Sequence, residues 1–235
     1  MKPLLSLAVL ALVAVLGGPA PAAPAREQVA TQSRQSQAET TPQAALDLLK
    51  AGNERFADGR SLQRDYLAQV RITATGQFPF ATVLACIDSR SAPELVFDQG
   101  IGDLFSPRIA GNFVNDDILG SMEFAAKLAG SKLIVVLGHT QCGAIKGACD
   151  DAALGNLTQM LAKLKPAVDG VTDDGTARNS KNPAFVQRVT DLNVQLTVDE
   201  IRRRSPVLAE MEQRGEIRIV GAMLDIATGK VTFSE

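Results

Sequence analysis

The sequence predicts an α/β fold in which a central, mainly parallel β-sheet is flanked by helices. Continuous apolar runs at residues 81–87 (ATVLACI) and 132–137 (KLIVVL) are typical of strands that are buried on both faces. Helical patterns separate and follow these runs, and such alternation favours parallel strands covered by helices. The composition, 46% hydrophobic and 21% charged over 235 residues, is enough for one sizeable core.

Local signals place the other elements in order. A helix is expected from Thr41, with Thr41 as its N-cap and Pro42 at the first helical position, and with Gly52 just past its end. Residues 170–182 are polar and contain glycine, as in a surface loop. The other expected helices cover 116–129, 152–164, 183–204 and 206–214, and the other expected strands cover 104–109, 217–224 and 230–233.

The N-terminus has the three-part plan of a secretory signal peptide over residues 1–25. Lys2 precedes an apolar run at 4–16, and small residues then offer cleavage after Ala22 or Ala25. A membrane anchor is the alternative, but a bilayer span needs ~20 apolar residues. The protein is therefore expected to be periplasmic or secreted, without membrane attachment once the signal is removed.

Residues 26–40 separate this signal from a single globular domain at 41–235. They are rich in Gln, Ser, Thr and Ala and hold almost no large apolar residue, which predicts a flexible linker. The net charge of −2 gives no sign of a nucleic-acid partner or an anionic membrane surface.

The three cysteines, Cys86, Cys142 and Cys149, have two competing interpretations. In an oxidising compartment a disulfide between two of them is the default. A metal site is the alternative, and it would leave Cys149 as a free structural thiol.

Two polar segments favour the metal site. Residues 86–90 (CIDSR) and 138–143 (GHTQCG) each follow a predicted buried strand, and the carboxyl ends of parallel strands meet at one edge of a sheet. Cys86, His139 and Cys142 would then provide two sulfurs and one nitrogen. Such a set with a fourth position left open is a known catalytic zinc arrangement.

The paired motifs C-x-D-S-R and G-H-x-x-C-G resemble those of the β-class carbonic anhydrases. The resemblance extends over about residues 41–235, which makes this range the expected catalytic domain. It includes the segments 93–100, 102–105, 110–112, 220–222 and 228–231. It also includes Arg108, which could serve either the site or the structure.

The resemblance implies the reversible hydration of CO2 to bicarbonate and a proton by a zinc-bound hydroxide, with one Zn2+ per chain. The ligands would be Cys86, His139 and Cys142. Asp88 and Arg90 would be catalytic, with Asp88 also able to close the site as a fourth ligand. The family further implies a homodimer or homotetramer with active sites at the subunit interface.

Five further residues have counterparts in the family. Gln77, whose amide could bond bicarbonate, Phe105, in the CO2 pocket, and Gly143 are assigned to substrate binding. Phe124 stands where related enzymes often carry tyrosine. Val83 stands where enzymes with a regulatory bicarbonate pocket carry tryptophan, so an open site is expected at neutral pH.

Several alternatives remain open at this point. The same scaffold could act on a CO2-like molecule such as carbonyl sulfide or carbon disulfide. A non-catalytic zinc- or redox-responsive protein would instead pair its cysteines. Asp88 and Arg90 could also form a purely structural ion pair.

Overall fold

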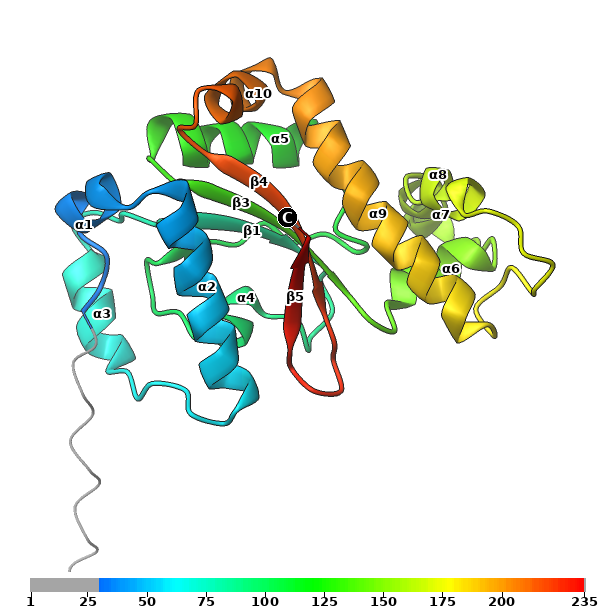
Figure 1. Ribbon diagram of the computed structural model, residues 1–235, viewed down its shortest axis with the longest axis horizontal. Coiled ribbons are helices and arrows are strands. Elements are labelled where there is room, and N and C mark those ends of the chain that lie inside the picture. The colour runs from blue at the N-terminus through cyan, green and yellow to red at the C-terminus, as the bar shows by residue number, and fades with distance from the viewer. Residues whose placement is uncertain (1–29, 235) are drawn as a thin grey trace, which may run out of the picture.

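A computed structural model describes residues 30–234, which form a five-stranded sheet in the order β2-β1-β3-β4-β5 (Figure 1). Neighbouring strands are parallel except at the edge, where β5 runs antiparallel to β4. The predicted mainly parallel α/β fold is therefore confirmed. The strands are β1 (Ala81–Ala85), β2 (Leu104–Phe105), β3 (Leu133–His139), β4 (Arg218–Leu224) and β5 (Val231–Ser234).

Helices of very different length surround this sheet. The longest, α9, spans Pro183–Arg204 as the sequence predicted, whereas the expected helix at 116–129 is α5 followed by the π-helix η1. The others are α1 (Arg34–Glu39), α2 (Pro42–Ala57), α3 (Tyr66–Thr73), α4 (Pro93–Val96), α5 (Asp116–Glu123), η1 (Phe124–Leu128), α6 (Gly143–Cys149), α7 (Gly155–Ala162), α8 (Lys165–Gly170) and α10 (Pro206–Gln213). Within residues 30–234, no helix combines the length and apolar character that a membrane span requires.

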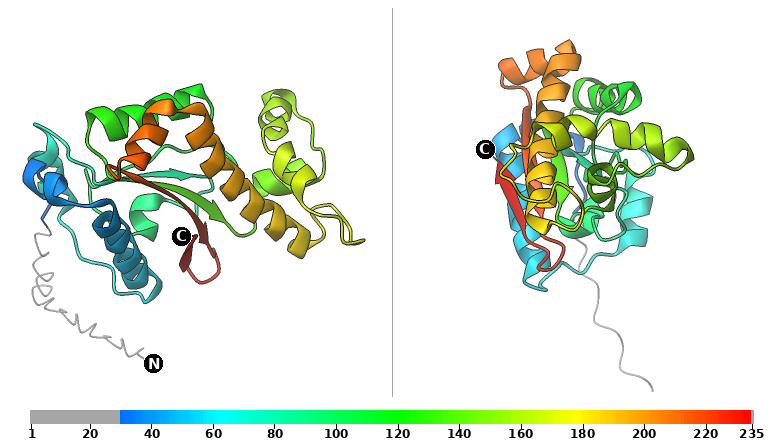
Figure 2. Two further views of the ribbon diagram at one scale, coloured as in Figure 1. Left: turned by 45° about the horizontal axis from the view of Figure 1, so that its top comes forward. Right: turned by 90° about the vertical axis from the view of Figure 1, so that its right-hand side faces the viewer.

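Each face of the sheet is buried by its own helices (Figure 2, left). Alternate strand residues such as Val83 and Val135 pack with Leu46 and Leu49 of α2 on one face. The intervening residues, such as Ile134, pack with α5, α9 and α10 on the other. This two-sided burial explains the continuous apolar strands, because neither face meets water.

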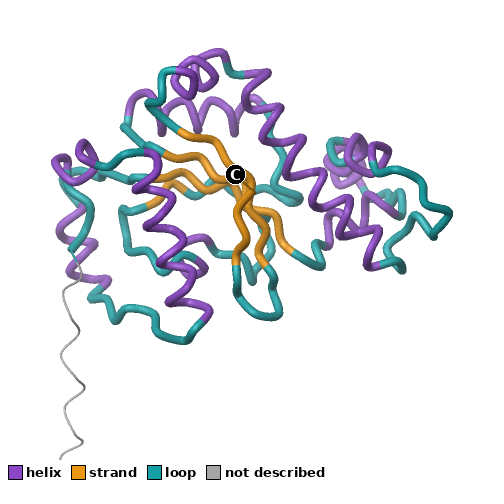
Figure 3. Tube along the Cα trace, viewed as in Figure 1, coloured by secondary structure: helices purple, strands orange, loops and turns teal. Residues whose placement is uncertain are grey.

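A third apolar cluster lies beyond the carboxyl ends of the strands, under the helices α6, α7 and α8 (Figures 1 and 3). It contains Cys86 and Cys142 together with Phe185 and Val189 from the first half of α9. The cysteines of the predicted metal site are thus enclosed by a small core of their own.

Helix α2 runs past the predicted stop at Gly52 and ends at Ala57. Gly52 lies inside the helix, and a glycine is needed there because a Cβ would lie 1.9 Å from the Phe97 carbonyl oxygen. The glycine therefore permits close helix packing, and the prediction that it ends the helix was wrong.

The interpretation of residues 26–40 as a flexible linker was also wrong for the part that is described. Arg34–Glu39 forms α1, with a capping box at Ser33 and Ser36. The Gln37 side chain, buried beneath it, donates from Nε2 to the carbonyl oxygens of Pro79 and Ala129, each at 2.8 Å. These two bonds fix α1 to the main body. The predicted signal peptide at 1–25 lies outside the described residues.

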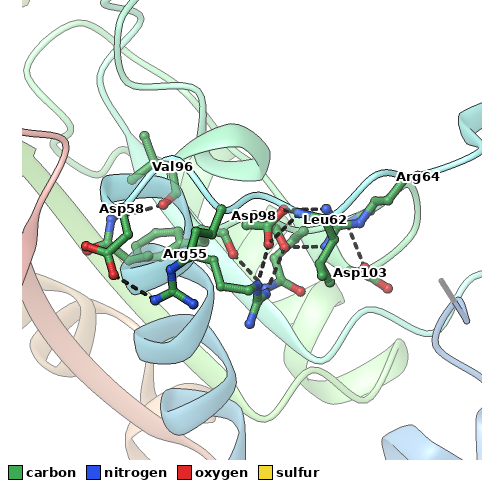
Figure 4. Close-up of polar contacts among 12 residues, drawn as sticks. Arg55, Asp58, Leu62, Arg64, Val96, Asp98 and Asp103 are labelled. Carbon is green, nitrogen blue, oxygen red and sulfur yellow. Dashed lines mark hydrogen bonds and ion pairs between the residues drawn. The ribbon is translucent and has the colours of Figure 1, made fainter. Parts of the chain in front are cut away.

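A largely buried ion-pair network joins α2 and the segment that follows it to the turn after α4 (Figure 4). The Asp98 carboxylate accepts from Arg55, Arg64 and the Leu62 amide. Burial alone would raise the pKa of Asp98, but the Arg64 and Arg55 guanidinium groups outweigh it and hold that pKa below its ordinary value.

Candidate metal centre

The two neighbouring strands β1 and β3 bring the predicted ligands together. Cys86 directly follows β1, His139 is the last residue of β3, and Cys142 is the N-cap of α6. Because β1 and β3 are paired in parallel, their carboxyl ends lie side by side. The ligating atoms of the three side chains all lie within 4.8 Å of one another, and all three residues are buried.

One ring nitrogen of His139 bonds the backbone, and the other faces the two cysteines. Nδ1 lies 2.9 Å from the Thr140 carbonyl oxygen, to which it donates in the tautomer that leaves Nε2 a lone pair. Nε2 is buried without a hydrogen-bond partner among the described residues. An unpartnered buried imidazole nitrogen beside two sulfurs fits a metal ion, because an empty site would leave its desolvation uncompensated.

The sulfurs are present as free thiols rather than as a disulfide. A hydrogen bond from the Cys142 thiol lowers the pKa of Cys86 despite the opposing effect of burial, with a smaller contribution from the Gly111 amide. Hydrogen bonding to Cys86 in turn raises the pKa of Cys142. A metal ion that binds both sulfurs would need both as thiolates, so its binding would release the proton that the pair still holds.

Asp88 stands next to the cluster and is held by Arg90. Arg90 Nε and Nη2 donate to Asp88 Oδ1 and Oδ2 at 2.9 and 2.8 Å, a bidentate pair. Asp88 Oδ2 also lies 3.9 Å from His139 Nε2. The Arg90 guanidinium holds the pKa of Asp88 well below its usual range, so the side chain is a carboxylate at neutral pH. Binding of Asp88 to the metal as a fourth ligand stays a prediction.

Arg108 fixes the backbone on which these groups stand. Its Nε donates to the Cys86 carbonyl oxygen at 2.9 Å and its Nη2 to the Asp88 carbonyl oxygen at 2.6 Å. The Ser91 hydroxyl donates to the same two carbonyls. The sequence left the role of Arg108 open between site and structure, because nothing in the chain order shows which carbonyls it would reach.

A largely apolar hollow of about 260 Å³ opens beside the cluster. Gly143 lines it, and beyond its own stretch of chain no atom lies within 4 Å of the position where a Cβ would stand, so space is open there. The hollow is lined by Cys86, Ile87, Asp88, Ala110, Gly143, Ala144, Gly147, Leu157, Met160 and Leu161. The wall from α6 and α7 was not anticipated, since the sequence assigned those leucines only to a helix.

The structure does not bring Gln77 and Phe105 to this hollow within one chain. Gln77 is exposed and precedes β1, at the opposite end of that strand from Cys86. Phe105 packs edge-on against Phe124, with ring centroids 6.2 Å apart, and both line a different hollow of about 680 Å³. Val83 is fully buried core.

A buried Cys2His cluster with a neighbouring carboxylate, at the carboxyl edge of a parallel sheet, is an arrangement that could hold a metal ion and leave one coordination position for a further ligand. The family described as carbonic anhydrase matches residues 81–231. The chain belongs to this family, and its fold and site place it in the β class.

Individual relatives agree over most of the chain. Carbonic anhydrase 2 of Mycobacterium tuberculosis is 36% identical over 202 residues, which cover 83% of this chain and 94% of that protein. The carbonic anhydrase of Mycolicibacterium smegmatis is 35% identical over 82% of this chain and 93% of its own. The solved structure of the β-carbonic anhydrase CafA of Aspergillus fumigatus has a TM-score of 0.62 and 26% identity, over 82% of this chain and 90% of that one.

Proposed function

We propose that this protein is an exported carbonic anhydrase that holds one zinc ion with Cys86, His139 and Cys142 and hydrates CO2 reversibly to bicarbonate. The observation that carries the proposal is the buried cluster of two sulfurs and one unpartnered imidazole nitrogen. Sulfur and imidazole are ligands that zinc favours, and two Cys with one His leave a fourth position open.

When bound, a zinc ion lowers the pKa of water to ~7, which makes hydroxide available near neutral pH. Asp88 lies beside the cluster and is ionised at neutral pH. Its carboxylate can therefore accept a hydrogen bond from the reacting oxygen and orient it. Arg90 holds both Asp88 oxygens, which would keep the carboxylate from becoming a fourth ligand of the metal. Arg108 fixes the backbone of both Cys86 and Asp88.

The hollow beside the cluster suits an uncharged substrate. Ala144, Leu157 and Met160 contribute apolar surface to it, and CO2 carries no net charge. The apolar wall disfavours ordered water at the place where CO2 would bind. Bicarbonate is charged, so once formed it is less stable there than in solution. This supports hydration and release of the charged product.

We further propose that a second copy of the chain completes the site, in a homodimer or homotetramer. Phe105 and Phe124 line a hollow separate from that of Cys86, and Phe124 is 51% exposed although it is aromatic. Contact with another copy would cover Phe124 and could bring Gln77 and Phe105 to a neighbouring cluster. Analytical ultracentrifugation tests this, and a monomer at micromolar concentration would contradict it.

Export is proposed from the sequence of residues 1–25 alone. N-terminal sequencing of the protein recovered from cells should give a chain that starts after Ala22 or Ala25. Recovery of a chain that still starts at Met1 from the cytoplasmic fraction would contradict it.

One experiment tests the activity and the metal together. Stopped-flow CO2 hydration and zinc content by mass spectrometry should give an active enzyme with one zinc per chain. His139→Ala should lose both, because it removes one of three ligands. Lys230→Ala, in the exposed turn before β5, is the control and should keep both. An active protein without zinc would refute the proposed metal centre.

A further inference from the structure

The peptide groups of Gly111 connect helix α9 to the sulfur of Cys86. The Gly111 N–H donates to Cys86 Sγ at 3.4 Å, and the Gly111 carbonyl oxygen accepts from Asn193 Nδ2 at 2.9 Å. Gly111 is buried and Asn193 is 4% exposed, so water does not compete for either bond. Asn193 lies in the middle of α9 and is far in sequence from the metal ligands.

The conformation at Gly111 leaves little freedom for this contact to adjust. Its φ is +82°, and a Cβ there would lie 2.7 Å from Cδ1 of Leu164, which is fully buried. The next residue closes a tight turn, with the Asn112 amide donating to the Ile109 carbonyl oxygen at 2.9 Å. The turn therefore presents the Gly111 amide to the sulfur, and Asn193 ties that turn to the helix.

We infer that Asn193 is a positioning residue of the metal centre, which acts by holding Gly111 so that its amide stays on Cys86 Sγ. This inference rests on the proposed zinc site. An N–H bond to a thiolate withdraws electron density from the sulfur and fixes its direction, and partners of this kind tune both metal affinity and reactivity. Without Asn193 the Gly111 carbonyl would lose its donor, so the turn would be held less firmly and its N–H would be less well oriented towards the sulfur.

Asn193 acts through Gly111 and not on the substrate. It lines a hollow of about 300 Å³ formed with Phe113, α8 and the loop before it, whereas Cys86 and Asp88 line the hollow beside the metal site. An effect of Asn193 on the metal centre through this hydrogen bond is therefore transmitted by the peptide groups of Gly111.

The chain offers a matched control for this role. Thr197 lies one turn further along α9, is also 4% exposed and lines the same hollow as Asn193. Asn193→Leu and Thr197→Val each replace a buried polar side chain by an apolar one of similar size. Only the first removes the donor to Gly111.

The test compares zinc release from the holoenzymes into excess chelator. Asn193→Leu should release zinc about tenfold faster than the wild type, at the low end of the effect of such partners, and Thr197→Val should be close to the wild type. Cobalt-substituted Asn193→Leu should also show a shifted thiolate-to-metal absorption band. Equal zinc release and equal spectra in the two variants would overturn the inference.

A measurement on the wild type keeps the test valid if Asn193→Leu does not fold. In protein loaded with cadmium-113, the Gly111 amide proton should show scalar coupling to the metal through Cys86 Sγ. A wild type that binds cadmium at this site without such coupling would overturn the inference. A wild type that binds neither zinc nor cadmium would refute the proposed function instead, so the two failures are distinguishable.

Discussion

Asp98 and Asp88 each pair with arginine, but they differ in burial. The side chains of Asp98 and Arg64 are 2% and 4% exposed, whereas those of Asp88 and Arg90 are 15% and 53% exposed. The bonds to Asp98 come from two guanidinium groups and a backbone amide, which join three segments of the chain (Figure 4). Asp88 is bonded by its near neighbour Arg90 and faces the metal cluster.

The difference shows how to distinguish a structural ion pair from a functional one. The charge of a fully buried carboxylate must be compensated by other groups of the fold, so its partners indicate a structural role. A partly exposed bidentate pair gains little stability, so its fixed geometry beside the unpartnered nitrogen of His139 needs another reason. Under the proposed function, that reason is the control of a reacting group at the metal site.

The largest expected effect is on stability at the buried pair. Asp98→Ala should lower the free energy of unfolding by about 3–5 kcal/mol, because it leaves the Arg64 guanidinium buried and unpaired. Asp47→Ala, whose carboxylate is exposed on α2, should change it by less than about 0.5 kcal/mol. Urea denaturation measures both, and similar values for the two variants would remove the contrast with Asp88.

The functional pair should show the reverse pattern. Asp88→Ala should lower kcat/KM for CO2 hydration by about 100-fold, because the carboxylate that orients the reacting oxygen is lost. Zinc content and urea midpoint should remain near those of the wild type, since a partly exposed ion pair contributes little stability. Stopped-flow assays and metal analysis test this, and loss of zinc from the variant would make Asp88 a ligand rather than an orienting group.

A charge-conserving change separates geometry from charge. Arg90→Lys should lower kcat/KM about tenfold, because lysine cannot hold both Asp88 oxygens in a fork. Arg60 also pairs with an aspartate two residues before it, Asp58, on the exposed surface away from the cluster, so Arg60→Lys is a matched control. Equal activity in the two variants would mean that the charge alone suffices at position 90.

The smallest effect is the acid dependence of the buried pair. The pKa of Asp98 is lowered in the folded state, so its stabilising contribution is complete above the unfolded value of ~3.9 and is lost as the pH falls below it. The difference in unfolding free energy between the wild type and Asp98→Ala should therefore be constant from about pH 5 to 7 and should shrink below about pH 4. Urea titrations across this range would contradict it if the difference grew in acid.

The sequence was most informative where chemistry follows strand ends. The proximity of Cys86 and His139 could be predicted because each lies at the carboxyl end of an apolar run, and the carboxyl ends of parallel strands meet at one edge of the sheet. For these two residues, the sequence motifs and the sheet topology predict the same site. Asp88 and Arg90 are two residues apart, so their pairing is local as well.

Long-range contacts were beyond prediction from single residues. In the sequence, Gln37 is one polar residue among many. In the structure, its side chain donates hydrogen bonds to backbone carbonyl oxygens 42 and 92 positions away. Gly52 looks like a helix stop, and only the approach of Phe97 shows why a glycine is there. Asn193 likewise has no local signal, because its partner Gly111 is 82 residues away.

Helix α9 belongs to two hydrophobic clusters. Phe185 and Val189 pack in the cluster around the cysteines, whereas Val194 and Ile201 pack against the sheet. Asn193 lies at the boundary between these halves. If the first half opened alone, it would expose the metal ligands while the second half stayed packed on the sheet. Faster amide exchange at Val189 than at Ile201 would show such local opening.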